Sequence, residues 1–166
     1  MKKITEILKV SPWVALSAVI VLIAIPFLIF LFPFFYIQNI RFENSYKNYL
    51  DELEGKSFFC YNNRLKGRSF IEEQLIPQLP DYIEVIFLNG MIPESQYEEK
   101  YISHALYQLK NYQRFPQLLK IRGGQTYDKS LNNELFNTME QNKPLGNLLT
   151  KMSEFFEVNG DEKEAA

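Results

Sequence analysis

The sequence predicts an α/β protein in which an N-terminal transmembrane helix precedes a small, mainly parallel sheet of three to four strands with flanking helices. Three features predict this fold: an uncharged apolar segment near the N-terminus, short runs of branched and aromatic residues, and amphipathic helical patterns between those runs. Parallel neighbours need a crossover of about a dozen residues or more, so strands that alternate with helices favour parallel pairing.

The apolar segment has no Asp, Glu, Lys or Arg from Val10 to Ile40 and predicts a membrane anchor over residues 1–40, with its span at about 12–37. A helix rises about 1.5 Å per residue and the hydrocarbon layer is about 30 Å thick, so this segment is long enough to cross it. We therefore expect a single-pass membrane protein.

Two alternatives to a simple span are open. A secretory signal has an apolar region of about 7–15 residues and a cleavage site of small residues, whereas this segment is longer and ends in Phe34, Phe35 and Tyr36. Pro26 and Pro33 each remove a backbone donor and leave a re-entrant hairpin open. One kinked span is the simpler interpretation.

The side of the membrane is weakly indicated. Three basic residues lie on each side of the segment, so the positive-inside rule gives no orientation; they are Lys2, Lys3 and Lys9 before it and Arg41, Lys47 and Lys56 after it. A lone Cys60 and the absence of any Asn-x-Ser/Thr sequon favour a cytoplasmic domain. We expect a bacterial inner-membrane protein with its soluble domain in the cytoplasm.

Beyond the anchor, we expect a juxtamembrane helix within residues 41–55, a soluble α/β domain over 56–158 and a disordered acidic tail over 159–166. Apolar residues recur at helical spacing between Ser45 and Leu53, with Asn44 before them as a cap and Gly55 after them as a stop. The tail is small, acidic and poor in apolar residues.

Strands are expected where branched and aromatic residues cluster between turn signals. The predicted strands are Phe58–Tyr61, Ile83–Leu88 and Leu118–Ile121, with an additional edge strand at 125–128. Helices are expected at Ser69–Leu79, where Ser69 and Glu72 form a capping box, at Glu94–Asn111, at 131–139 after a Ser130 cap, and from Pro144 onward.

Charge is segregated along the soluble domain. Two windows lack acidic residues: one holds Lys56, Arg64, Lys66 and Arg68, and the other holds Lys110, Arg114, Lys120 and Arg122. The rest of the chain after the anchor is strongly acidic. Such a split predicts local basic patches that admit a polyanion at one place and repel it elsewhere.

In a parallel sheet, ligands bind beyond the carboxyl ends of the strands, and all three predicted strands end in polar or glycine-containing turns. The first turn leads into the helix expected at Ser69, whose free N–H groups favour a phosphate. The predicted ligand-binding residues are Arg64, Lys66, Arg68, Ser69, Lys120, Arg122, Gly123 and His104. The alternative for the charged residues is that they are solvated loop side chains.

Catalytic, metal and cofactor signatures are missing from the sequence, so we expect a protein that is not an enzyme and has no catalytic residue, metal or cofactor. His104, the only histidine, is expected on the flank of a helix, where it is a boundary residue, a ligand contact or a base. Cys60 is expected as a buried, inert thiol. Arg114-Phe115-Pro116 before a strand resembles the proline loop of thioredoxin-like folds, but the paired cysteines of their redox site are missing.

A short chain with one N-terminal membrane segment and a small domain carrying a basic site resembles the membrane effectors of type III CRISPR antiviral defence. The resemblance is one of architecture and covers the whole chain, with fewer strands than the sensor domain of those proteins. It implies a sensor that binds cyclic oligoadenylate, assembles as a homo-oligomer in the lipid bilayer and transmits binding to its membrane segment.

The first functional hypothesis is therefore a membrane-anchored sensor of a phosphate-rich nucleotide, a cyclic oligonucleotide, with no duplex nucleic acid as partner. The second is a membrane-anchored scaffold that docks a protein partner or anionic lipid. The third is an enzyme acting on a nucleotide or sugar phosphate with His104 as base.

Overall fold

A computed structural model describes residues 12–110 and 114–157 of the chain. The tail expected at 159–166 and the first three lysines lie outside the described residues. The chain divides into two compact units, residues 1–45 and 46–166.

Helix α1 (Pro12–Glu52) is one helix of 41 residues that continues through Pro26 and Pro33. The re-entrant hairpin is therefore not formed, and the segment is a single helix, long and apolar enough to cross a membrane by length and composition. The juxtamembrane helix expected after Asn44 is not a separate element, because its residues form the C-terminal end of α1. Tyr46, Tyr49, Leu50 and Leu53 are buried in the second unit.

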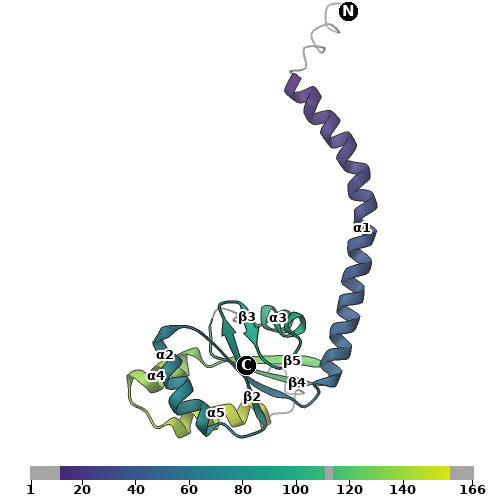
Figure 1. Cartoon of the computed structure of the whole chain (residues 1–166). Helices are drawn as coiled ribbons and strands as arrows, with labels where there is room; N and C mark the ends of the chain where they lie inside the picture. Colours follow the sequence, from purple (N-terminus) through teal and green to yellow (C-terminus); the bar gives the residue numbers. More distant parts are fainter. Residues whose placement is uncertain (1–11, 111–113, 158–166) are drawn as a thin grey trace, which may run out of the picture. The chain divides into compact units, whose positions relative to one another are not determined.

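The second unit is an α/β domain with five strands: β1 (Ser57–Asn62), β2 (Ile83–Asn89), β3 (Ile92–Glu94), β4 (Gln117–Arg122) and β5 (Gln125–Ser130). Their order in the sheet is β3-β2-β1-β4-β5 (Figure 1). The predicted α/β class is confirmed, whereas the small, mainly parallel sheet of three to four strands is wrong. Only β1 and β2 pair in parallel, and the other pairs are antiparallel.

The added strand β3 reverses the chain. Gly90-Met91 connects β2 to β3 in a tight hairpin, with Gly90 at a φ of 68°. The following helix, α3 (Glu99–Tyr107), starts later than the expected Glu94. Beyond α3, β4 begins beside the end of β1, where Gln117 pairs with Cys60, and ends beside the start of β1, where Lys120 pairs with Ser57.

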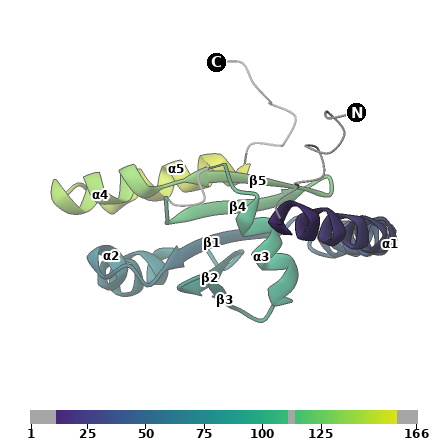
Figure 2. The same ribbon diagram turned by 90° about the horizontal axis from the view of Figure 1, so that it is seen from above.

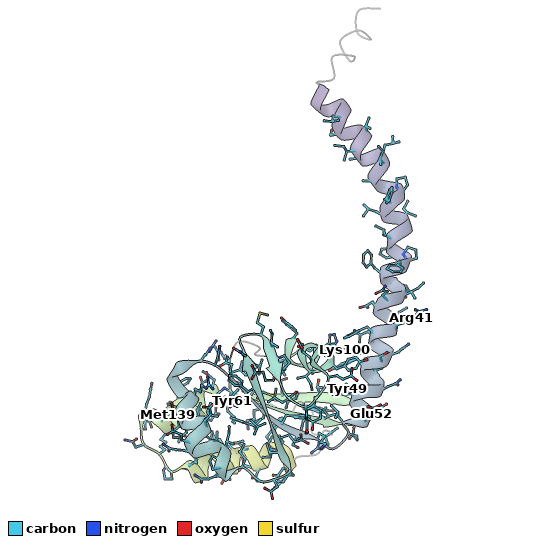
Figure 3. All side chains as sticks on the ribbon, viewed as in Figure 1. Arg41, Tyr49, Glu52, Tyr61, Lys100 and Met139 are labelled. Atoms are coloured by element: carbon cyan, nitrogen blue, oxygen red, sulfur yellow. The ribbon has the colours of Figure 1, made fainter. Side chains whose placement is uncertain are left out.

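The two ends of the sheet are named here by the turns that lie at them. We call the end where β1 finishes and β4 begins the Asn62 end, and the end where β1 begins and β4 finishes the Gly123 end. In Figure 3, Tyr61 lies toward the first end, while Tyr49 and Glu52 of α1 lie toward the second.

Helices cover both faces of the sheet. One face carries α2 (Leu65–Phe70), its continuation through a π-helical turn (Ile71–Leu75) and a 3₁₀ turn (Ile76–Gln78), α4 (Asn132–Glu140) and α5 (Leu145–Glu157). Helices α4 and α5 contact each other, and Figure 2 shows both on the same side of the domain. The core on this face comprises Phe59, Tyr61, Ile71, Leu75, Ile83, Leu118, Leu131, Leu135, Leu148, Met152 and Phe156.

Successive residues of a strand point to opposite sides of the sheet. The strand residues between the core residues of the first face therefore point to the opposite face. Phe58 packs edge-on against Tyr97, and the tyrosines at the end of α1 stack near Tyr101 of α3. The last two turns of α1 therefore belong to the core of the domain.

The helix after β1 begins earlier than the sequence indicated. Its first residue is Leu65 rather than Ser69, so Ser69 is an exposed residue inside α2 and the predicted capping box with Glu72 is wrong. The N–H of Arg64 donates to Oδ1 of Asn62 at 3.4 Å, and this short-range bond turns the chain into the helix directly after the strand.

The tight turn between β4 and β5 gives a test of the sheet. Gly124→Ala should lower the free energy of unfolding by about 1–2 kcal/mol, because a residue with a β-carbon is strained at positive φ. Gly124 has a φ of 64°, and a Cβ there would lie 2.9 Å from Oδ1 of Asp51. Gly146→Ala in α5 is the control, since a Cβ there meets no atom within 4 Å; it should leave stability unchanged or raise it by up to about 1 kcal/mol. Urea unfolding of the full chain in detergent measures both, and equal stabilities would contradict the turn geometry.

Candidate anion-binding site

The mixed sheet separates the predicted binding residues into two groups. Arg64 and Arg68 follow β1 at the Asn62 end, whereas Lys120, Arg122 and Gly123 lie at the Gly123 end, because β4 runs antiparallel to β1. The expectation that the turns after all three predicted strands meet at one edge is wrong. The two groups cannot hold the same small anion.

At the Gly123 end, Arg122 is engaged by the backbone of its own domain. Its Nη1 donates to the carbonyl oxygens of Lys56 at 3.0 Å and Ile121 at 2.7 Å, and its Nη2 donates to Oγ of Ser57 at 3.3 Å. The guanidinium therefore donates to carbonyl groups where β1 begins. These bonds give Arg122 a structural role in joining the end of β4 to the start of β1.

Gly123 does bind an anion, and that anion is the carboxylate of Glu54. The N–H groups of Gly123 and Gly124 donate to Oε1 and Oε2 of Glu54 at 2.9 and 3.0 Å. These two bonds, from Gly124 first and then Gly123, lower the pKa of Glu54 below its ordinary value. The backbone N–H of Gly123, which we expected to contact a ligand, thus binds a side chain of the protein itself.

Lys120 is buried, with 3% of its surface exposed. Its Nζ donates to the carbonyl oxygen of Phe155 near the end of α5 and lies 4.7 Å from the centre of the Phe155 ring. Burial, and then the charge of Arg122, lowers the pKa of Lys120. This ammonium group stabilises the C-terminal turn of α5 and does not face an open site.

His104 lies on α3 and is half-buried against the end of α1. Its ring packs edge-on against Tyr46 at 4.6 Å between centroids, and its Nε2 lies 2.8 Å from Nε2 of Gln108. This is the boundary position expected from the sequence.

At the Asn62 end, Arg68 extends across the surface of α2. Its Nε donates to Oε1 of Glu72 at 2.9 Å, and its guanidinium lies 4.9 Å from the centre of the Phe87 ring. Tyr61 donates to the same carboxylate oxygen at 3.1 Å. Lys66 also belongs to α2, but its side chain lies outside the described part of the structure.

Arg64 borders a small cavity of about 20 Å³, enough for one water molecule. The cavity lies where the end of β1 meets the start of β4 and is lined by Tyr61, Asn62, Arg64, Gly67, Ile71, Phe115, Pro116, Leu135 and Phe136. Pro116, whose peptide bond with Phe115 is cis, directly precedes β4.

A larger depression of about 360 Å³ lies at the same end and contains basic residues that the sequence analysis did not place in the site. Its lining is Lys110, Arg114, Asp128, Lys129, Ser130, Asn133 and Glu134. Burial raises the pKa of Asp128, and Lys110 opposes that shift. Both Lys110 and Arg114 belong to the second acid-free window, so the sequence identifies them as basic residues near a strand. Placing them at this end of the sheet also requires the direction of β4.

Residues of both basic windows therefore lie at the Asn62 end. Arg64 and Arg68 come from the first window, Lys110 and Arg114 come from the second, and Lys129 of β5 joins them. We call these five residues the Asn62-end cations; each is a side chain of the kind that binds anions by charge-assisted hydrogen bonds.

Comparison of the chain with protein-family models, with curated proteins and with solved structures finds no match.

Cys60 gives a test of the sheet core around this site. It is fully buried on β1, and this burial raises the pKa of its thiol to about 12. Because the thiolate is the reactive form, native protein at pH 8 should react with a thiol-specific disulfide reagent at least about a hundredfold more slowly than protein unfolded in urea. Absorbance of the released thiolate measures both rates, and rapid labelling of the native protein would contradict a buried Cys60.

Proposed function

We propose that the protein is a membrane-anchored sensor whose α/β domain binds a phosphate-rich nucleotide at the Asn62 end and is not an enzyme. The observation that carries the proposal is that the Asn62-end cations, which come from three segments of the chain, lie at the same end of the sheet. These segments are the β1–α2 connection with α2, the connection between α3 and β4, and β5.

Pairing between β1 and β4 supports a common site for the two arginines. Cys60 and Gln117 are direct partners, so the chain after β1 and the chain before β4 leave the sheet side by side. Arg64 lies four residues beyond Cys60, and Arg114 lies three residues before Gln117. Both side chains are exposed. Arginine binds phosphate through two parallel N–H groups, which suits a ligand with several phosphate oxygens.

The balance of charge at this end also favours an anion. Four carboxylates lie near the five cations: Glu72, Glu94, Asp128 and Glu134. Glu72 already accepts from Arg68 and Tyr61, and Glu134 pairs with Lys151 at 3.5 Å. A local excess of positive charge on a chain whose net charge is -2 directs an anion to one part of the surface.

The dimensions of the site limit how a nucleotide would bind. The cavity beside Arg64 has room for one water, so a base would not enter it. The neighbouring depression of about 360 Å³ is open and polar, and it suits phosphates and riboses near the surface. An extended ligand such as cyclic oligoadenylate would then contact a second subunit, as a homo-oligomer provides.

The proposed ligand determines on which side of the membrane the domain must lie. An intracellular nucleotide messenger requires the domain to face the cytoplasm, and α1 would hold it at the bacterial inner membrane. The antiviral role and the resemblance to CRISPR membrane effectors are part of the same proposal.

A second candidate function is a scaffold that docks a protein partner. It is favoured by three large exposed apolar side chains on the β2–β3 hairpin and α3: Met91, Ile92 and Tyr107. The hydroxyl of Tyr107 lies 3.9 Å from the sulfur of Met91, so two of these side chains are neighbours.

Calorimetric titration of the full chain in lipid nanodiscs with cyclic tetra-adenylate tests the sensor proposal. The wild type should bind, and the double variant Arg64→Ala/Arg114→Ala should bind at least about tenfold more weakly, because each charge-assisted hydrogen bond contributes about 1.5–3 kcal/mol.

The matched control is Lys47→Ala/Lys100→Ala, which removes the same charge from exposed positions in the last turns of α1 and at the start of α3. It should bind as the wild type does. No binding by the wild type, or equal losses in the two double variants, would reject the proposed site.

A further inference from the structure

The connection between α1 and β1 is bonded to the end of β4 by its backbone. The N–H of Gly55 donates to the carbonyl of Ile121 at 3.1 Å, and the N–H of Ile121 donates to the carbonyl of Lys56 at 3.1 Å. These bonds extend the β1–β4 pairing into the connection. The side chain of Glu54, the residue before Gly55, adds a further contact to the β4–β5 turn.

The turn that receives Glu54 has the geometry of an anion cradle. Gly123 and Gly124 have φ values of 59° and 64°, a conformation that turns both N–H groups toward one point. Each N–H donates to a different carboxylate oxygen, at 2.9 and 3.0 Å. A group with two oxygens on one centre fits this cradle, and phosphate and sulfate share that feature with a carboxylate.

Glu54, which occupies the cradle, is placed where a dissolved anion can replace it. Glu54 is exposed and lies on a short connection, so water and solutes reach its carboxylate. The same two N–H groups lower its pKa, which keeps it charged at neutral pH. Protonation therefore does not release Glu54 near neutrality, whereas a competing anion would.

The charges around the turn permit such competition. Arg122 is the positive group that acts on Glu54, while Lys56 is held by Glu84. Asp51 is the opposing charge, because its Oδ1 lies close to Gly124. A free oxyanion would thus meet the cradle, one guanidinium and one carboxylate.

We propose that the Gly123–Gly124 turn is an oxyanion site that Glu54 occupies as an internal ligand, so that free phosphate-class anions compete with Glu54 and loosen the connection between α1 and β1. Burial of Leu50 and Leu53 keeps the end of α1 in the domain while Glu54 is displaced. This site lies at the opposite end of the sheet from the Asn62-end cations and does not rest on the proposed function.

Nuclear magnetic resonance of the full chain in detergent micelles tests the proposal, because the sequence has only 7 glycines. Labelling with ¹⁵N-glycine gives few signals, and Gly124 is the only glycine that directly follows another glycine. Glycine labelled at the carbonyl carbon therefore identifies its amide. Sodium phosphate is the probe, with sodium chloride at equal ionic strength as reference.

In Glu54→Gln, the Gly124 amide should shift saturably with phosphate, at a midpoint about tenfold or more below that of the wild type, because a tethered carboxylate acts at an effective concentration in the millimolar range. Glu52→Gln, which removes a neighbouring exposed carboxylate, should behave as the wild type does. Glu54→Asp, whose shorter side chain holds the cradle less well, should give an intermediate midpoint.

The proposal is overturned if Gly124 shows no phosphate-specific shift in either Glu54 variant, or if both share the wild-type midpoint. Signals of Gly55 and Gly90 report whether each variant is folded. Should Glu54→Gln fail to fold, the comparison of Glu54→Asp with the wild type decides the question in the same way.

Discussion

The antiparallel pairing of β4 with β1 is the constraint on which the rest of the structure depends. It is held by two rows of buried apolar side chains, with Phe59 opposite Leu118 on one face and Phe58 opposite Leu119 on the other. Shifting this pair by one residue would move every side chain to the wrong face, so the register is strongly determined. The pairing fixes which turns share an end of the sheet and therefore which charged residues meet.

The direction of β4 follows from the small strand β3. Because β3 returns the chain to the Gly123 end, α3 starts there, where the N–H of Glu98 donates to the hydroxyl of Tyr49. The chain leaving α3 then reaches the Asn62 end before β4 begins. Without β3, a helix directly after β2 would have carried the chain back to the other end and given a parallel strand.

This explains how far the sequence predicts the fold. The runs around Phe59, Ile86 and Leu119 are apolar enough to be identified as strands in either direction, so their positions follow from composition. Strand direction depends on the path between them, and the sequence analysis treated Asn89-Gly90 as the end of a strand instead of the turn of a hairpin. One missed three-residue strand reverses the inferred direction of β4 and moves half of the predicted site to the other end.

The density of charged residues along the sequence does not distinguish cations exposed at the surface from cations that bond to the protein's own backbone. Lys120 and Arg122 alternate with Ile121 along β4, so both point to the face that α5 covers at Lys120, and their polar groups bond to backbone carbonyls. Arg64 and Arg114 lie just outside the strands and are exposed. The distinction depends on the position of each residue relative to the end of its strand, which a count of charges along the sequence does not contain.

The same topology gives a direct physical route between the two ends of the domain. Strand β1 begins at the connection that follows α1 and ends two residues before Arg64, a path of six residues, or about 20 Å. Strand β4 runs the opposite way, from Gln117 near Arg114 to the turn that holds Glu54. A displacement of either strand along its axis would require every hydrogen bond of the pair to change, so the two strands move as one unit. The pairing of β1 with β4 therefore gives a continuous hydrogen-bonded path from the Asn62 end to the connection that follows α1.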